Sequence, residues 1–376
     1  MNRLHIICFD QPYPPTYGGV VDVFYKILEL HKAGVRLVLH IFLYGDSVAQ
    51  PELEQYAEEV HYYPLIKGKK LFCSMLPYFI GCRKNKKLIE DLATDDDPVL
   101  FEGIHTCGWI NDPRLRNRYK IVRAHNVELA YYWHLFLDTK WCKQKLIFLN
   151  EVIKLFFTEN YLLSRADRIL TLSEADCRHF KKSLTNKDVR LTNCFFRVPT
   201  LPMTPSKPVI SDKYVLYHGN LAISDNEYTA KYIIEKILPL LKKDVKFVLA
   251  GKNPSARLAH ILEHNGNVIL IPNPSMVDME NILYYSHVNL MLTFQSTGSK
   301  LKILNSLASS EGFCIANDKM LVGNHLSELC VVASSDEEIA EAIEKCLNSP
   351  ITEGILTQRH KSLLALGYND VSNITN

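Results

Sequence analysis

Short apolar runs alternate with longer amphipathic stretches along most of the chain. The first run, LHIICF at 4–9, leads into a turn rich in proline and glycine at 11–19. The next stretch, VVDVFYKILELHKAG at 20–34, places its apolar residues at helical spacing, and Gly34 is a normal residue for a helix C-cap. A strand followed by a helix and another apolar run predicts βαβ units with a parallel sheet.

The same pattern continues through two halves of the chain, and a segment of different composition separates them. In the first half we expect strands at 35–44, 59–65, 97–104, 119–126 and 165–173, and a long helical stretch at about 129–165. Residues 197–213 hold four prolines and little periodicity, which indicates a linker. Alternation then resumes, with strands expected at 214–220, 246–251, 267–272, 288–293, 313–317 and 329–334, and helices at 225–243 (with Asp225 as N-cap), 299–310 and 336–348.

These elements predict an α/β protein with two doubly wound, Rossmann-like parallel-sheet domains that face each other across a cleft. We expect an N-terminal domain at 1–197, a linker at 198–212, a C-terminal domain at 213–350, and a helix or tail at 351–376 that could return to the N-terminal domain. In such sheets ligands bind at the carboxyl ends of the strands, where the topology switches. The active site is therefore expected in the cleft.

Composition narrows the function classes. The chain of 376 residues has a formal net charge of +2, which gives no reason to expect a nucleic acid as partner. Its ten cysteines lack C-x-x-C spacing, which favours a reducing compartment. No signal peptide and no run of about 20 apolar residues is visible, so we expect a cytoplasmic protein that at most lies on the inner face of the cytoplasmic membrane. Neither G-x-G-x-x-G nor a P-loop follows a first strand, which disfavours nicotinamide and flavin enzymes.

Polar clusters follow several strands of the first half. Glycines after the first strand would let the backbone approach a phosphate or a sugar oxygen at a helix N-terminus, although they also suit an ordinary βα turn. Polar residues at the ends of the strands 97–104 and 119–126 could bind a sugar hydroxyl or an acceptor. The alternative is a buried network that satisfies the loop backbone. The candidates on this side are Tyr17, Gly18, Gly19, Glu102, His105, Arg123, His125, Asn126 and Glu128.

The second half offers two further clusters. His218, Asn220 and Asn226 surround the end of its first strand, at a switch-point position. The segment from Thr297 through Gly298, Ser299 and Lys300 to Lys302 opens the helix that contains Asn305. The helix dipole alone would favour acids there, so lysines in that turn suit an anionic ligand such as a diphosphate. A basic solvated face is the alternative.

Taken together, these segments resemble the GT-B glycosyltransferases, of a glycosyltransferase family 4-like type common in Bacteroidetes polysaccharide loci. The likeness rests on PYPPTYGG at 12–19, RAHNVE at 123–128, HGN at 218–220 and GSKLKILNSLA at 298–308, and it covers nearly the whole chain. It implies a retaining transfer of a hexose-type sugar from a nucleoside-diphosphate sugar to a glycan or lipid-linked acceptor in cell-surface polysaccharide biosynthesis. No D-x-D motif is present, and we expect neither a metal nor another cofactor.

The resemblance also implies roles for individual residues. Among the expected catalytic residues, the resemblance implies that His125 contacts the donor sugar and that Lys302 faces the diphosphate, while Glu102 is included for its place at the end of the strand 97–104. The expected donor-binding residues are Gly18, Gly19, His218, Asn220, Asn226, Asn273 (at the nucleobase), Thr297, Gly298, Ser299, Lys300 and Asn305. From their places after the strands of the first half, we also expect Tyr17, His105, Asn126 and Glu128 on the acceptor side. The chain departs from the family where the paired glutamates of E-x7-E are Thr297 and Asn305, and where the usual Arg and Lys of the donor domain are Asn220 and Asn226.

Two rival functions and one further partner stay open. A sugar-nucleotide epimerase shares this fold, and the replaced glutamates also suit a non-catalytic sugar-nucleotide-binding protein. The stretches 67–87 and 140–157 mix lysines with aromatic and aliphatic residues, as do segments that lie on anionic membranes. A core helix with a basic rim would explain the same composition.

Overall fold

The structure is a computed structural model, and it describes the whole chain except residues 16–17, 45–47, 140, 197–207, 209, 264–265, 295–300, 324 and 367. It divides into two compact units. The first unit contains Met1–Phe195 and Asn369–Asn376, and the second contains Phe196–Tyr368. The expected linker at 198–212 lies almost entirely outside the described residues.

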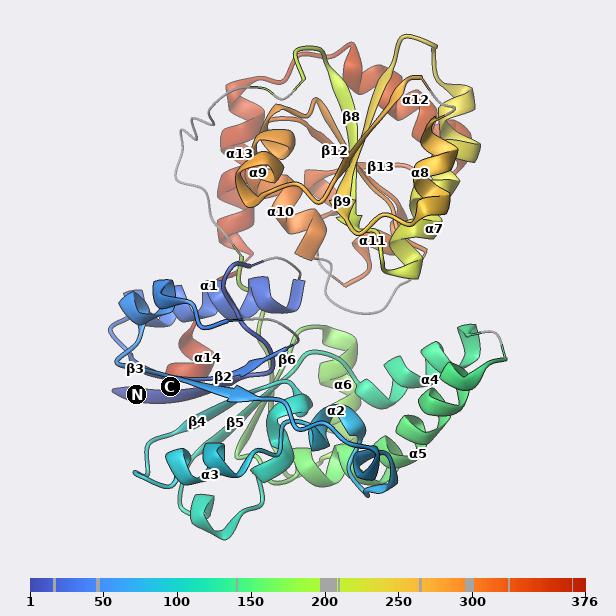
Figure 1. Cartoon of the computed structure of the whole chain (residues 1–376). Helices are drawn as coiled ribbons and strands as arrows, with labels where there is room; N and C mark the ends of the chain where they lie inside the picture. The colour runs from blue at the N-terminus through green and yellow to red at the C-terminus, as the bar shows by residue number, and fades with distance from the viewer. Residues whose placement is uncertain are drawn as a thin grey trace. The chain divides into compact units, whose positions relative to one another are not determined.

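The first unit is built on a seven-stranded parallel sheet of order β3-β2-β1-β4-β5-β6-β7 (Figure 1). Its strands are β1 (Arg3–Cys8), β2 (Arg36–Leu43), β3 (Glu59–Pro64), β4 (Val99–Glu102), β5 (Lys120–Ala124), β6 (Arg168–Thr171) and β7 (Asp188–Leu191). Its α-helices are α1 (Gly18–Lys32), α2 (Tyr78–Gly81), α3 (Lys86–Leu92), α4 (Glu128–Asp138), α5 (Lys143–Leu163), α6 (Glu174–Ser183) and α14 (Ser372–Thr375). The strand order reverses direction between β1 and β4, which makes their carboxyl ends a switch point.

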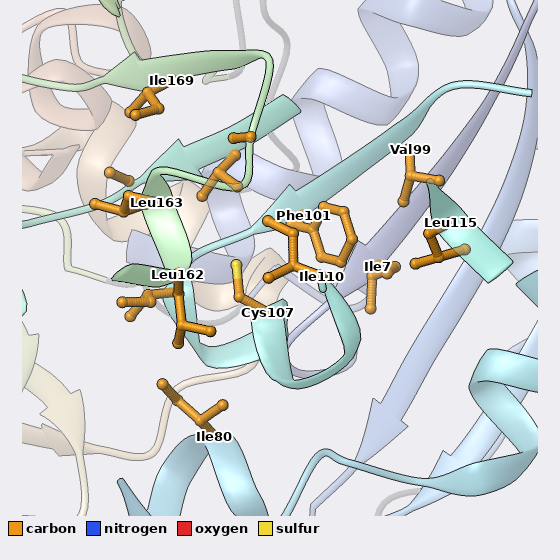
Figure 2. Packing of buried hydrophobic residues seen from close by; sticks show 14 of the residues in the cluster. Ile7, Ile80, Val99, Phe101, Cys107, Ile110, Leu115, Leu162, Leu163 and Ile169 are labelled. Atoms are coloured by element: carbon orange, nitrogen blue, oxygen red, sulfur yellow. The ribbon is translucent and has the colours of Figure 1, made fainter. Parts of the chain in front are cut away.

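Both faces of this sheet are buried, which explains why its strands are continuous apolar runs without polar alternation. Successive residues of β4 and β5 point to opposite sides, so Phe101 and Val122 join one core while Leu100 and Ile121 join the other. Figure 2 shows Phe101 packed among Ile7, Ile110 and Cys107 in the first of these cores.

The second unit repeats the design with six parallel strands in the order β10-β9-β8-β11-β12-β13. The strands are β8 (Tyr214–Asn220), β9 (Lys246–Lys252), β10 (Val268–Pro272), β11 (Val288–Met291), β12 (Phe313–Ala316) and β13 (Val331–Val332). The helices are α7 (Ser224–Tyr232), α8 (Ala256–Glu263), α9 (Met276–Tyr285), α10 (Leu301–Ser309), α11 (Asp318–Leu321), α12 (Asp336–Leu347) and α13 (Glu353–Ala365). Its switch point lies between β8 and β11.

The predicted parallel-sheet α/β class is confirmed, and the details correct several element boundaries. Asp225 does not cap α7, because the helix starts one residue earlier with Ile223 at the N-cap, and the Asp225 carboxylate accepts a hydrogen bond from Thr293 Oγ1 at 3.1 Å. The helix expected at 225–243 leaves α geometry after Tyr232 and ends in a 3₁₀ turn that contains Pro239. Helix α13 belongs to the second unit, and within the expected tail at 351–376 only Asn369–Asn376 packs with the first unit.

Candidate functional site

A network of buried charges lies at the switch point of the first unit. Glu102 ends β4, Arg123 lies in β5, and Asp22 and Lys26 lie one turn apart on α1. Lys26 Nζ donates to Glu102 Oε1 at 2.6 Å and to Asp22 Oδ2 at 3.1 Å. The Arg123 guanidinium donates two hydrogen bonds of 2.9 Å to the Asp22 carboxylate, and the Phe195 backbone N–H donates a third to it at 2.8 Å. The network thus binds α1 to the ends of two strands.

The charges of this network balance one another inside the core. Two carboxylates face one ammonium and one guanidinium, and all four side chains are almost completely buried. Burial alone would raise the pKa of Asp22, but Arg123 and Lys26 hold it well below its usual range. In the same way Lys26 and His125 lower the pKa of Glu102 against the effect of burial. Both carboxyl groups therefore stay ionised.

His125 is the member of the network that reaches the surface. Its Nε2 lies 3.2 Å from Glu102 Oε2, and its side chain is 12% exposed while that of Glu102 is fully buried. A Glu102 carboxylate can only accept, so it fixes the tautomer with the proton on Nε2 and leaves Nδ1 as an acceptor. The Phe9 ring contacts both His125 and His105, at centroid distances of 5.4 and 5.7 Å. The sequence predicted Glu102 as a group in contact with ligand, but both of its oxygens are engaged, so we assign it a positioning role.

The RAHNVE segment continues into α4, whose N-terminus holds a pair of buried carboxyl groups. Glu159 of α5 accepts from the Glu128 backbone N–H at 2.6 Å, and Asn126 Nδ2 lies 3.4 Å from Glu128 Oε1. Burial and the neighbouring Glu159 raise the pKa of Glu128 to about 8, and burial raises that of Glu159 to about 7. Sequence reasoning missed Glu159, because nothing in a helix pattern shows that a glutamate 31 residues away caps α4.

In the second unit the candidate residues gather where β8 ends. His218 is buried, and its Nε2 lies 3.0 Å from Ser306 Oγ of α10, so it holds that helix against β8. Asn226 Nδ2 donates to the Asn220 carbonyl at 2.9 Å. Lys302, in the first turn of α10, lies 4.5 Å above the Tyr217 ring and 3.5 Å from Asn226 Oδ1. Its ammonium is thus fixed at the switch point.

Lys252 is a further cation at this edge that the sequence analysis missed. Strand register places it opposite Asn220, at the end of β9. A Cβ on Gly251 would lie only 2.0 Å from the Gly219 carbonyl oxygen, so glycine is required for this close approach. Burial lowers the pKa of the Lys252 ammonium. The apolar run KFVLAG could have drawn attention to the lysine that follows it, but only the register shows that it lies beside Asn220.

Asn273 follows β10 at the same edge of the sheet. Its backbone has a φ of 49°, and its Oδ1 accepts from the Asn253 backbone N–H at 2.8 Å. Asn305 lies on α10, one turn after Lys302, and is half-buried. Gly18 and Gly19 open α1, as expected. Tyr17, Thr297, Gly298, Ser299 and Lys300 lie outside the described residues.

Two groups of side chains in the described part of the chain have metal-ligand spacing. Asp22, Glu102 and His125 form one, and His5, Asp95 and Asp97 form the other, each with its donor atoms within 4.8 Å. Lys26 and Arg123 already neutralise the first group, and Arg3 contacts both aspartates of the second. A divalent cation would have to displace these side chains, so neither group fits a metal site. That the reaction needs no metal stays a prediction.

A comparison with protein-family models gives a match in the second unit. Residues 212–349 match the family model of group 1 glycosyl transferases. These residues form a glycosyl transferase domain. The domain contains β8 to β13 and the Lys302 and Lys252 side chains, so the candidate residues of this unit belong to it.

The whole chain has the GT-B fold of several solved glycosyltransferases. It is similar to sucrose-phosphate synthase from Thermosynechococcus elongatus, with 14% identity and a TM-score of 0.69, covering 100% of this chain and 97% of that one. Anabaena HepE, solved with UDP and glucose, gives 12% identity and a TM-score of 0.66 over 98% and 96% of the two chains. The structure of OtsA gives 14% identity and the same TM-score over the same shares.

One curated relative aligns along nearly the full sequence. It is an uncharacterized 44.6 kDa protein from the cps region of Klebsiella pneumoniae, 24% identical over 372 residues that cover 90% of this chain and 94% of the relative. The predicted glycosyltransferase resemblance and the GT-B fold are thus confirmed. The expected link to Bacteroidetes loci and the roles of the individual site residues stay predictions.

Proposed function

We propose that the protein transfers a hexose-type sugar from a nucleoside-diphosphate sugar to a glycan or lipid-linked acceptor, with retention of configuration, in the assembly of a cell-surface polysaccharide. The observation that carries the proposal is the anchored lysine of the group 1 glycosyl transferase domain, Lys302, at the switch point of its sheet. The relative from a cps region supports the polysaccharide context. HepE with UDP and glucose supports a nucleoside-diphosphate sugar as donor.

The transfer breaks the bond between the anomeric carbon and the diphosphate oxygen, and forms a bond from that carbon to an acceptor oxygen. Positive charge develops on the sugar ring, as in glycoside hydrolysis, while negative charge grows on the leaving diphosphate. Fixed cations at the position of that charge contribute the most to catalysis. We assign this role to Lys302 and, beside Asn220, to Lys252. The acceptor hydroxyl proton passes to the departing diphosphate.

His125 is the group of the first unit that we assign to the donor sugar. Its Nδ1 accepts a hydrogen bond from a sugar hydroxyl, because Glu102 holds the Nε2 proton. We assign Asn126 and His105 to the acceptor side. Glu128 contacts the Asn126 side-chain amide and would position it there. Since Asn305 replaces a glutamate of the family, we propose that its amide bonds the ribose without adding charge.

We also propose that the enzyme works in the cytoplasm, on the inner face of the cytoplasmic membrane, where a lipid-linked acceptor would lie. No helix in the described part of the chain is both long enough and apolar enough to cross a membrane. Contact with the membrane would therefore be made from the surface.

The experiment that tests the function is a screen of UDP, GDP and their sugars by thermal shift, followed by an assay of donor turnover. Binding to the folded state raises the melting temperature by linkage. A glycosyltransferase consumes the donor with release of the nucleoside diphosphate, and faster when the acceptor is present. Isomerisation of the sugar without release would support an epimerase instead, and binding without any turnover would support a non-catalytic protein.

A further inference from the structure

The helical hairpin formed by α4 and α5 exposes apolar side chains on its outward sides and at its tip. Figure 1 shows the two helices side by side, at the edge of the first unit, and they pack against each other. Six large residues make up what we call the hairpin apolar face, and their exposed fractions run from 44% to 79%: Trp133, Leu137, Trp141, Ile153, Phe156 and Phe157. Trp141, in the connecting turn, is the most exposed of them. So many large exposed apolar side chains on two packed helices favour an interaction site over an ordinary solvated surface.

The position of these residues follows from helix geometry and is not a failure of packing. Glu151, Leu155, Thr158 and Glu159 fill the buried side of α5, while Ile153, Phe156 and Phe157 fall on the opposite side at i, i+3 and i+4. Leucines such as Leu155 and Leu162 also face inward, so α5 departs from the usual amphipathic arrangement only in part: two glutamates are buried with them, while two phenylalanines face solvent. Glu151 is held inside by the Tyr78 backbone N–H at 2.7 Å, and Glu159 by that of Glu128.

The charges around the face are basic. The carboxylates of α4 and α5 whose side chains the structure describes, Glu128, Glu151 and Glu159, are all buried. A short 3₁₀ segment, Lys69–Cys73, is fixed beside α5 because Lys154 Nζ donates to the Phe72 carbonyl at 2.9 Å. This segment and the residues before it expose Lys67, Lys69 and Lys70, together with Phe72 and Met75. Lys143 adds an exposed cation at the start of α5.

We propose that the hairpin apolar face docks on a membrane that contains anionic lipids. Trp141 and the phenylalanines enter the boundary between headgroups and acyl chains, where aromatic rings are favoured, and Lys67, Lys69 and Lys70 lie over the lipid phosphates. A second copy of this chain fits the face less well, because it would bring the same lysines against each other, and the carboxylates of α4 and α5 whose side chains the structure describes are buried and do not meet them. The inference deepens the proposed function, since it gives the enzyme a position from which a lipid-linked acceptor is reached.

The test is co-sedimentation of the full chain with phosphatidylglycerol vesicles and with pure phosphatidylcholine vesicles. We expect binding to the anionic vesicles, a loss of at least tenfold in W141S/F156S/F157S, and a weaker, less salt-sensitive interaction in K67E/K69E/K70E. The matched control is I355S/L364S, which removes two exposed apolar residues from α13 in the second unit and should bind as the wild type does. Melting temperatures show that each variant is folded.

Two further measurements separate the outcomes. Equal binding by the W141S/F156S/F157S variant and the wild type, or no binding by either, overturns the proposal. So does a wild-type dimer in sedimentation velocity that the same variant abolishes while neither protein binds lipid. The nucleotide thermal shift is measured on every variant. A shift that persists without vesicle binding refutes the docking alone, whereas vesicle binding without any nucleotide shift or donor turnover refutes the proposed function alone.

Discussion

The proposed chemistry depends most directly on the side chain of Lys302. Its ammonium rests on the Tyr217 ring and beside Asn226, in the first turn of α10. We expect Lys302→Ala to lower kcat for donor turnover by about 100-fold, because a fixed cation at the leaving group contributes on that scale. The melting temperature should change little, since the Lys302 side chain is only half-buried. Lys345→Ala, which removes an exposed lysine from α12 of the same unit, is the matched control. Unchanged turnover in the purified Lys302 variant would refute the assignment.

Glu102 is expected to act through stability and orientation. Glu102→Gln removes one of two buried negative charges and leaves Lys26 with Asp22 as its only carboxylate partner in the described network. Breaking a buried ion pair from one side costs about 3–5 kcal/mol, so chemical denaturation should show a loss of that order. At a temperature where the variant is still folded, turnover should also fall, because an amide no longer selects one tautomer of His125. Full stability in Glu102→Gln would show that the network is not as strongly coupled as its distances indicate.

At the scale of elements, the N-terminus of α4 makes stability depend on pH. Glu128 and Glu159 have pKa values raised above the usual value of a glutamate, chiefly by burial. A group whose pKa is higher in the folded state stabilises the fold below its unfolded pKa, and this contribution is lost as the pH rises through the folded value. The two residues should therefore weaken the fold progressively between about pH 4.5 and pH 8.

Glu159→Gln tests this effect, because it keeps a side-chain oxygen for the backbone N–H groups of α4 but cannot ionise. The variant should be close to the wild type near pH 5 and exceed it by roughly 3 kcal/mol near pH 8.5, as linkage gives for a pKa raised from 4.5 to about 7. Melting temperatures of both proteins across this range give the difference directly. Glu174→Gln, at an exposed acid of α6, should show no such trend. A constant difference at all pH values would mean that Glu159 is ionised throughout.

Elements with one dominant pattern were predictable from the sequence, and elements that depend on distant partners were not. Apolar runs such as LHIICF mark strands buried on both faces, and these were placed within a residue or two of β1. Strand β7, with the sequence DVRL, was missed because its charged residues are satisfied by neighbours, as Asp188 is by Arg168 at 2.8 Å. The candidate loops were found from their polar residues. The ion pairs that these residues form could not be predicted, because Lys26 contacts Glu102 across 76 residues of sequence and Arg123 contacts Asp22 across 101.

At the scale of the whole molecule, the two units carry different kinds of candidate chemistry. In the first unit the charges of the network at the switch point are buried and paired, and among its described side chains His125 is the partly exposed one. In the second unit Lys252 ends β9 opposite Asn220, and Lys302 lies in the first turn of α10 beside Tyr217 of β8. Both lysines lie within the residues that match the glycosyl transferases. An anion such as a diphosphate is attracted by the second arrangement, whereas the first is already neutral. The nucleotide should therefore bind to the second unit.

Hydrogen exchange of the full chain, with and without saturating UDP or GDP, tests this division. At 100 times its Kd, a nucleotide adds about 2.7 kcal/mol to the stability of the unit that binds it. Exchange should slow at the ends of β8, β9 and β10 and along α10, around Asn220, Lys252, Asn273 and Lys302. Amides of the buried network in β4 and α1 should be little affected by the nucleotide alone. Protection confined to the first unit would refute the assignment of the donor site, because it would place the diphosphate on a network that has no uncompensated positive charge to offer it.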